Sequence, residues 1–162
     1  MTRPLSLRLT RLAAFGLAAA LLVLPRIAAA DAWSALKGRI FISDTEFGSG
    51  FASDAEMVSA IKKQSKTSIK GDGSWTLHMT VFLKEPAGAD KINIVYYDVT
   101  KKREQVNFSE VDVKPDQKMV QLNGISISHD LGFVKGHKYD VLATRLIGGK
   151  EKVYAKTQLT LK

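Results

Sequence analysis

Residues 75–83 read WTLHMTVFL, and apolar and polar side chains alternate along most of this stretch. One face carries five apolar side chains: Trp75, Leu77, Met79, Val81 and Leu83. The other face carries Thr76, His78 and Thr80, together with Phe82. A period of two residues is typical of a β-strand with one buried face. The stretch therefore predicts one long strand that lines a hydrophobic core.

The same alternation continues downstream and predicts further strands. Their approximate ranges are 92–97, 106–113, 119–127 with an interruption at 123–124, 139–146 and 153–161, and a short apolar strand at 39–42 precedes them. Turns are expected at 86–90, at the charged tip 100–104 and at Gly148-Gly149, which fits a two-residue hairpin. About seven short strands separated by turns predict an all-β, antiparallel β-sandwich, with a closed barrel as the alternative.

One short helix is predicted before the main strands, at about residues 54–66. Ser53 and Glu56 form an S-x-x-E capping box, in which the serine hydroxyl accepts from a free backbone N–H. The glutamate is expected to bind the Ser53 amide in return. An apolar stripe follows at Met57, Val58 and Ile61. The stripe either binds a partner or closes one edge or end of the sheet, and the second interpretation is the simpler one.

The connection before the penultimate strand carries a recognisable order of residues. They are Leu131, Gly136, Tyr139, Val141 and Ala143. This order resembles the tyrosine corner of fibronectin type III and related immunoglobulin-like domains, where a loop leads into the penultimate strand. The likeness covers about residues 74–161. The resemblance implies an immunoglobulin-like sandwich in which the Tyr139 hydroxyl binds backbone of the preceding loop. It also implies a core role for Trp75 and, in the next strand, for Ile94 and Tyr96.

The resemblance departs from the usual pattern in two respects. The helix near residues 54–66 is not part of that pattern, and the two cysteines of antibody domains are missing. Because such folds carry many unrelated functions, the likeness favours binding or scaffolding by analogy alone.

The first 30 residues have the layout of a secretory signal peptide. Arg3, Arg8 and Arg11 precede an uncharged, mostly aliphatic run at 12–24, and small residues stand at 28–30. We expect cleavage after Ala30, which leaves a single domain at 31–162 in the periplasm or the extracellular space. An uncleaved N-terminal anchor is the alternative. No later stretch is apolar enough to span a membrane.

Composition restricts the chemistry of the exported part. Four of the 24 basic residues and none of the 16 acidic ones lie in the first 30 positions, so the net charge of +8 falls to +4. Lysine predominates over arginine there, and nucleic-acid binding is not expected because arginine supplies most bidentate base contacts. The absence of cysteine excludes thiol catalysis, cysteine-ligated zinc and iron–sulfur clusters.

No motif in the chain predicts a catalytic residue, a metal ion or a cofactor. The three histidines, His78, His129 and His137, lack the spacing of zinc ligands, and Asp44 and Glu46 lack the pattern of a calcium loop. We therefore expect a non-enzymatic protein. The alternatives are a small secreted hydrolase, using acids near Asp44 or histidines near His129, and a carbohydrate-binding module.

The leading hypothesis is a binding or accessory module that contacts a protein or polysaccharide partner. Its candidate contact residues are Tyr97, Tyr154, Lys101, Lys102 and Arg103, with Phe82 as a further exposed aromatic residue. Aromatic rings on a strand face form a platform for a partner strand or a sugar chain. A core position is the simpler interpretation for Phe82 and Tyr97. The basic runs at 62–70 and 101–103 are most simply solvated faces, although together they suit an anionic surface.

Overall fold

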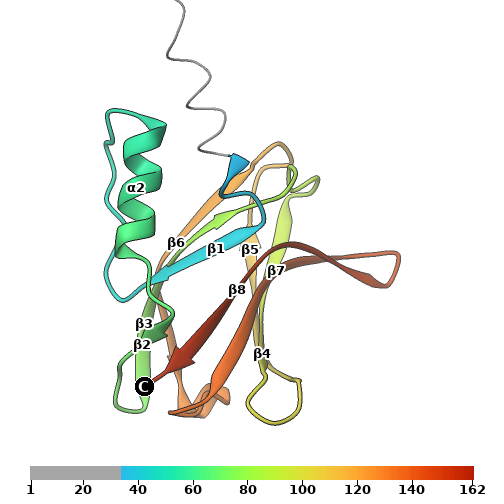
Figure 1. The fold of residues 1–162 in the computed structure, drawn as a ribbon. Coiled ribbons are helices and arrows are strands. Elements are labelled where there is room, and N and C mark those ends of the chain that lie inside the picture. Colours follow the sequence, from blue (N-terminus) through green and yellow to red (C-terminus); the bar gives the residue numbers. More distant parts are fainter. Residues whose placement is uncertain (1–33) are drawn as a thin grey trace, which may run out of the picture.

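The computed structural model describes residues 34–162, and the predicted signal peptide at 1–30 lies outside the described part. Over these residues the protein is mainly β with one α-helix, as the alternation predicts (Figure 1). The elements are β1 (Arg39–Ser43), α2 (Asp54–Gln64), β2 (Ser68–Ile69), β3 (Ser74–Phe82), β4 (Lys91–Asp98), β5 (Glu104–Asp112), β6 (Met119–Ser128), a short 3₁₀ helix (His129–Leu131), β7 (Lys138–Ile147) and β8 (Lys150–Leu161).

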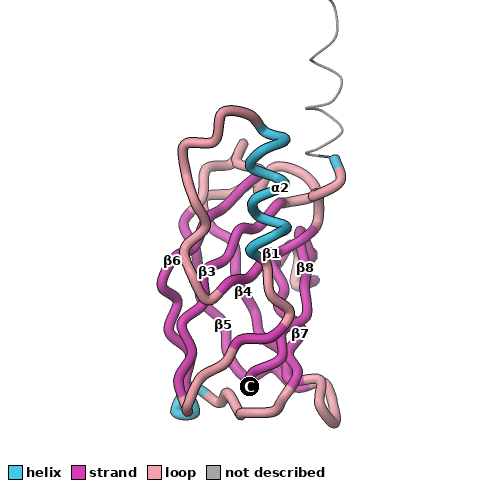
Figure 2. The backbone as a smooth tube through the Cα atoms, turned by 60° about the vertical axis from the view of Figure 1, so that its left-hand side comes forward, coloured by secondary structure: helices cyan, strands magenta, loops and turns pink. Residues whose placement is uncertain are grey.

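Hydrogen bonds connect the strands in the order β5-β4-β7-β8-β1-β3-β6, and β2 adds to β8. Neighbours are antiparallel except that β1 and β2 each run parallel to β8. The β1–β8 pairing consists of one residue pair, Arg39 with Lys156. The sheet is strongly curled, and Figure 2 shows its strands surrounding a common interior.

The predicted inner face of β3 is buried in full. Trp75, Leu77 and Met79 pack with the inward side chains of β4, β7 and β8 in one large core. The interruption predicted at Asn123-Gly124 is a β-bulge within a continuous strand. There β6 inserts one extra residue between the partners of Leu77 and Met79. Gly124 has a φ of 68°, which suits glycine at such a bulge.

The prediction that Tyr154 lies exposed on a strand face is wrong. The pairing of β7 with β8 shifts between Ala143 and Thr144, and Tyr154 is the extra residue of β8 at that point. This bulge interrupts the alternation that the sequence implies, so two successive residues, Tyr154 and Ala155, both enter the core. The tyrosine is only 2% exposed and cannot contact a partner.

Phe82 is buried as well, which agrees with the simpler of its two interpretations, a core position. It lies on the face of β3 opposite the main core, where Phe41 packs edge-on to it at 5.8 Å between ring centroids. Helix α2 adds Val58 and Ile61 to the same cluster. In both views the helix lies alongside β1 (Figures 1 and 2). Its apolar stripe therefore covers the sheet, and the interpretation as a partner-binding face is not supported.

The capping box forms with one difference from the prediction. Ser53 Oγ accepts from the Glu56 N–H at 3.2 Å, while the Glu56 carboxylate accepts from the Ala52 N–H at 2.8 Å instead of binding Ser53. The helix ends at Gln64, before Lys66, because the Lys66 N–H donates to the Ile42 carbonyl of β1. No helix within residues 34–162 has the length and apolar character that crossing a membrane requires.

Two features of the β6–β7–β8 region follow local sequence rules. The Tyr139 hydroxyl accepts from the Val134 N–H at 2.7 Å, which is the loop contact expected of this tyrosine. Gly148 and Gly149, with φ of 56° and 76°, form the two-residue turn between β7 and β8. Figure 1 shows the tip of this hairpin standing away from the rest of the protein.

Candidate partner-binding surface

The strands β5, β4, β7 and β8 present one side to solvent, which we call the outer face. Alternation along β4 sends Ile94 and Tyr96 into the core and therefore directs Val95 and Tyr97 to the outer face. Val95 lies between Phe108 of β5 and Leu142 of β7 across the strands. An apolar row thus crosses three strands on a side that faces water.

A shallow cleft of about 310 Å³ opens on the outer face. Its lining residues are Asn93, Val95, Tyr97, Gln105, Phe108, Thr144, Leu146 and Glu151. Phe108 and Leu146 are 60% and 66% exposed, and they are the two most exposed of the large apolar side chains in residues 34–162. Contiguous exposed apolar surface bordered by polar groups is typical of an interaction site.

Tyr97 and Arg103, both predicted as contact residues, meet beside this cleft. The Arg103 guanidinium lies 3.6 Å from the centroid of the Tyr97 ring, and the Tyr97 hydroxyl donates to Glu151 Oε1 at 3.1 Å. Burial and the hydrogen bond to the Glu151 carboxylate raise the pKa of Tyr97, so its hydroxyl stays protonated and donating. The ring is held on two sides before any partner arrives, which reduces the entropy cost of binding.

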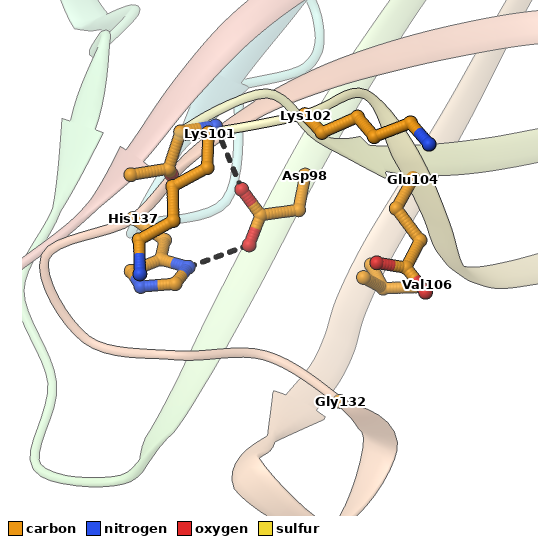
Figure 3. A pocket seen from close by; sticks show the side chains of 8 residues that line it. Asp98, Lys101, Lys102, Glu104, Val106, Gly132 and His137 are labelled. Atoms are coloured by element: carbon orange, nitrogen blue, oxygen red, sulfur yellow. Dashed lines mark hydrogen bonds and ion pairs between the residues drawn. The ribbon is translucent and has the colours of Figure 1, made fainter.

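Lys101 and Lys102, the other predicted contact residues, point elsewhere. They line a second cleft of about 500 Å³ between the β4–β5 tip and the connection before β7 (Figure 3). The predicted contact residues therefore divide among three places: Tyr97 and Arg103 by the outer face, Lys101 and Lys102 in the second cleft, and Tyr154 in the core.

Asp98 and His137 form a hydrogen-bonded pair in the second cleft. The sequence drew attention to the histidine but not to its acidic partner. His137 Nδ1 lies 2.5 Å from Asp98 Oδ2, and the Thr100 N–H donates to Asp98 Oδ1 at 2.8 Å (Figure 3). Burial raises the pKa of Asp98, but these hydrogen bonds outweigh it and hold the pKa below its ordinary value. The two residues are 39 positions apart, so no local motif marks them.

The pair resembles the acid–histidine part of a hydrolytic site, but within residues 34–162 no side-chain hydroxyl is hydrogen-bonded to the His137 ring. Thr100 is the one hydroxyl residue among its eight lining residues, and its Oγ1 already accepts from the Lys138 N–H at 2.9 Å. An imidazole held by a carboxylate needs an activated hydroxyl, thiol or water beyond it to perform acyl transfer. The Asp98–His137 hydrogen bond orients the His137 ring and connects the end of β4 to the start of β7.

Replacing Asp98 with asparagine is expected to lower the free energy of unfolding at pH 7 by about 1–3 kcal/mol, since a charged acceptor of two hydrogen bonds is lost. Because the folded-state pKa is depressed, this contribution is present above the ordinary carboxyl value of 3.8 and is lost as the pH falls below it. Denaturation curves of both proteins should therefore differ at pH 7, and the difference should shrink as the pH is lowered below 3.8. Asp116→Asn, at an exposed turn, should show no such difference.

The other residues considered from the sequence for catalysis or metal binding lie apart from one another, and each has its own partner. His129 packs edge-on against Trp75 at 5.5 Å, and its Nδ1 lies 2.7 Å from the Phe133 carbonyl oxygen. Asp44 forms an ion pair with Lys66, whose hydrogen bond lowers the Asp44 pKa, while Glu46 accepts from Asn123. Within residues 34–162 no three histidine or acidic side chains converge as metal ligands would.

No protein-family model matches the chain, and no curated protein or solved structure matches it either. The outer face and the second cleft are therefore interpreted from their own chemistry.

Proposed function

We propose that this protein is an exported, non-enzymatic binding module that contacts a partner protein through the outer face. The observation that carries the proposal is the exposure of Phe108 and Leu146 around a cleft whose floor, Val95, is already buried. Covering the two exposed side chains with a partner would contribute about 1.5–3 kcal/mol each at full burial. The Tyr97–Arg103 pair adds the residue types that dominate interface energetics.

A protein partner suits this surface better than a polysaccharide. The exposed groups of the cleft include Leu146, whose branched aliphatic side chain offers a sugar ring no flat face for stacking. Of the two aromatic side chains that line the cleft, only Phe108 has an open ring, because Arg103 already covers the ring of Tyr97. Apolar and aromatic residues with an arginine form the usual centre of a protein–protein interface.

We further propose that the fold is an immunoglobulin-like β-sandwich. The strand order supports this, since the ladder between the groups β5-β4-β7-β8 and β1-β3-β6 consists of the single pair Arg39–Lys156, with one backbone hydrogen bond from Lys84 to Tyr154 near it. The Tyr139–Val134 hydrogen bond also agrees with the tyrosine corner of such domains. Export is supported by the signal-peptide layout of residues 1–30.

The double substitution Phe108→Ala with Leu146→Ala is expected to weaken partner binding at least about tenfold, because exposed apolar anchors supply much of the energy of an interface. The test immobilises the protein, captures partners from an extract of the cell envelope of its source, and measures the affinity of the captured protein for both variants. The matched control is Leu131→Ala, which removes an exposed apolar side chain that does not line the cleft.

Equal affinity of the captured protein for the double variant and the wild type would contradict the proposal. Capture of a polysaccharide through the same face would show that the outer face is the binding site but that its partner is not a protein. Melting temperatures should stay close to that of the wild type, because both replaced side chains are mostly exposed.

A further inference from the structure

The outer face ends at a strand edge whose backbone groups are not used. β5 is the last strand of the hydrogen-bonded order, and among the described residues it pairs only with β4. The Val113 N–H donates to the Asp90 carbonyl at 2.8 Å, which sets the alternation of the antiparallel ladder. By that alternation the N–H and C=O groups of Phe108, Glu110 and Asp112 point away from β4.

This edge is open along its second half. Ser109, Glu110 and Asp112 are exposed, whereas Gly132 of the β6–β7 connection approaches the Val106 carbonyl at the other end of the strand. Unpaired strand edges are usually blocked by charged side chains, above all lysine, by proline or by a bulge. β5 contains no lysine, proline or glycine, and its one bulge, near Val106, lies before the open part.

The opposite edge of the sheet is built differently. β6 is interrupted by the bulge at Asn123-Gly124, and the Asn123 side chain donates to Glu46 from the loop before α2. A bulge and a covering loop both discourage an added strand. The two ends of the strand order are therefore unequal. Of the two, only β5 has an uninterrupted stretch, 108–112, in which every second residue directs its backbone groups outward.

The charges of β5 indicate what kind of chain fits this edge. Its charged residues are Glu104, Glu110 and Asp112, and it has no basic residue. Lys91 of β4 pairs with Glu110 at 2.5 Å and offsets one of these three charges. An extended segment with lysine or arginine beside the strand would gain from opposite-charge cross-strand pairs.

A second copy of this chain would meet like charges on the same edge in two of the antiparallel registers. Antiparallel pairing of two β5 strands centred on Phe108 would place Glu104 opposite Asp112, and pairing centred on Glu110 would place that residue opposite itself. Like charges directly opposite each other destabilise a strand pair. The edge thus favours a different, basic polypeptide.

We propose that β5 binds an extended, basic polypeptide segment as an added β-strand along residues 108–112, next to the exposed Phe108 ring. The proposal rests on the binding function assigned to the outer face and specifies how that partner is held. Backbone hydrogen bonds supply affinity in this mode, and side chains beside the added strand supply specificity. The Phe108 side chain would be covered by the neighbouring residue of the added strand.

The first test measures amide hydrogen exchange with a defined probe. The probe is a ten-residue peptide of alternating lysine and valine with blocked ends, and the charge control replaces each lysine with glutamate. We expect the lysine peptide at saturation to slow exchange at the Phe108, Glu110 and Asp112 amides at least about tenfold, since each gains a hydrogen-bond acceptor. The glutamate peptide should leave these rates unchanged.

Unchanged exchange at the three amides with the lysine peptide would overturn the proposal. Slower exchange that depends on protein concentration without peptide would also overturn it, because it would assign the edge to a second copy. This measurement uses the unaltered protein, so it does not depend on whether a variant folds.

The second test uses two substitutions at one position. Glu110→Pro removes an outward N–H without removing a hydrogen bond to β4, and proline is tolerated in edge strands. Glu110→Gln keeps the N–H and removes only the charge. We expect Glu110→Pro to reduce the affinity for the lysine peptide at least about tenfold, while Glu110→Gln reduces it about two- to fivefold.

The outcomes separate this proposal from the proposed function. If Glu110→Pro binds the captured partner as well as wild type while the Phe108→Ala, Leu146→Ala variant does not, the outer face is the site and strand addition is wrong. If the Phe108→Ala, Leu146→Ala variant keeps full partner affinity, the proposed function fails whatever the peptide does.

Discussion

Replacing Trp75 with alanine is expected to lower the free energy of unfolding by about 3–5 kcal/mol, near the limit that a domain of this size tolerates. The indole is buried at the start of β3, and its N–H donates to the Lys162 carbonyl at 3.3 Å. Truncation leaves a cavity in the core and removes one of the two donors to that carbonyl, the other being the Gly71 N–H at 2.7 Å. The approach is close enough that Gly71 has no room for a side chain, since a Cβ there would lie 2.5 Å from the indole.

Urea denaturation followed by far-ultraviolet circular dichroism measures this loss. Thr76→Ala is the matched control, because the neighbouring residue lies on the exposed side of the same strand. Its effect should stay within about 0.5 kcal/mol. A loss below about 1 kcal/mol for Trp75→Ala would contradict the placement of the indole in the core.

Phe133→Ala is expected to have an effect of similar size, about 3–5 kcal/mol. Its ring is buried against Tyr96, edge-on at 5.2 Å, and against Tyr139 at 5.3 Å. Aromatic pairs contribute about 0.5–1.5 kcal/mol beyond the area they bury. The same connection carries Val134, which binds the Tyr139 hydroxyl, so the loop should lose its anchor as well.

Thermal melting and near-ultraviolet circular dichroism test this second prediction. Leu131→Ala in the same connection is the control. Because Leu131 is 46% exposed, this variant should have a melting temperature close to that of the wild type. Equal melting temperatures for the two variants would show that the connection is not held by the core. Because the connection also places His137 beside Asp98, their contact should weaken with Phe133→Ala and stay intact with Leu131→Ala.

Features decided by near neighbours in the chain could be predicted from the sequence. The alternation at 75–83 identified β3 and its buried face because a strand's faces repeat every two residues. Ser53 marked the helix start because its hydroxyl needs only the N–H three residues on. Gly148-Gly149 marked the last hairpin because both positions require positive φ.

Features decided by distant pairing could not be predicted in this way. Tyr154 was misplaced because a bulge against β7 changes which side chains of β8 face inward. Phe82 was left with two interpretations, core or surface, because the residues that cover it come from α2 and β1, which alternation in β3 does not reveal. The Asp98–His137 contact joins the end of β4 to the start of β7, and only the strand order brings these together.

The candidate surface was predicted in part. Tyr97 and Arg103 were named from the residue types at the end of a strand and at a charged tip, and the structure brings them into contact. Phe108 and Leu146 were assigned to strands but not to the surface. Their exposure depends on which side of the sheet lacks a covering layer, and no pattern within a single strand carries that information.

The place of β8 in the strand order has a consequence for the growing chain. β8 lies between β7 and β1, which are about a hundred residues apart in the sequence. Neither strand has its full set of neighbours until β8 is in place. A nascent polypeptide that leaves the ribosome in order cannot complete this structure until residue 161 has emerged. Pairing over such separations is slow, because a long loop must close before the contacts form, so the sheet is expected to be completed late in folding.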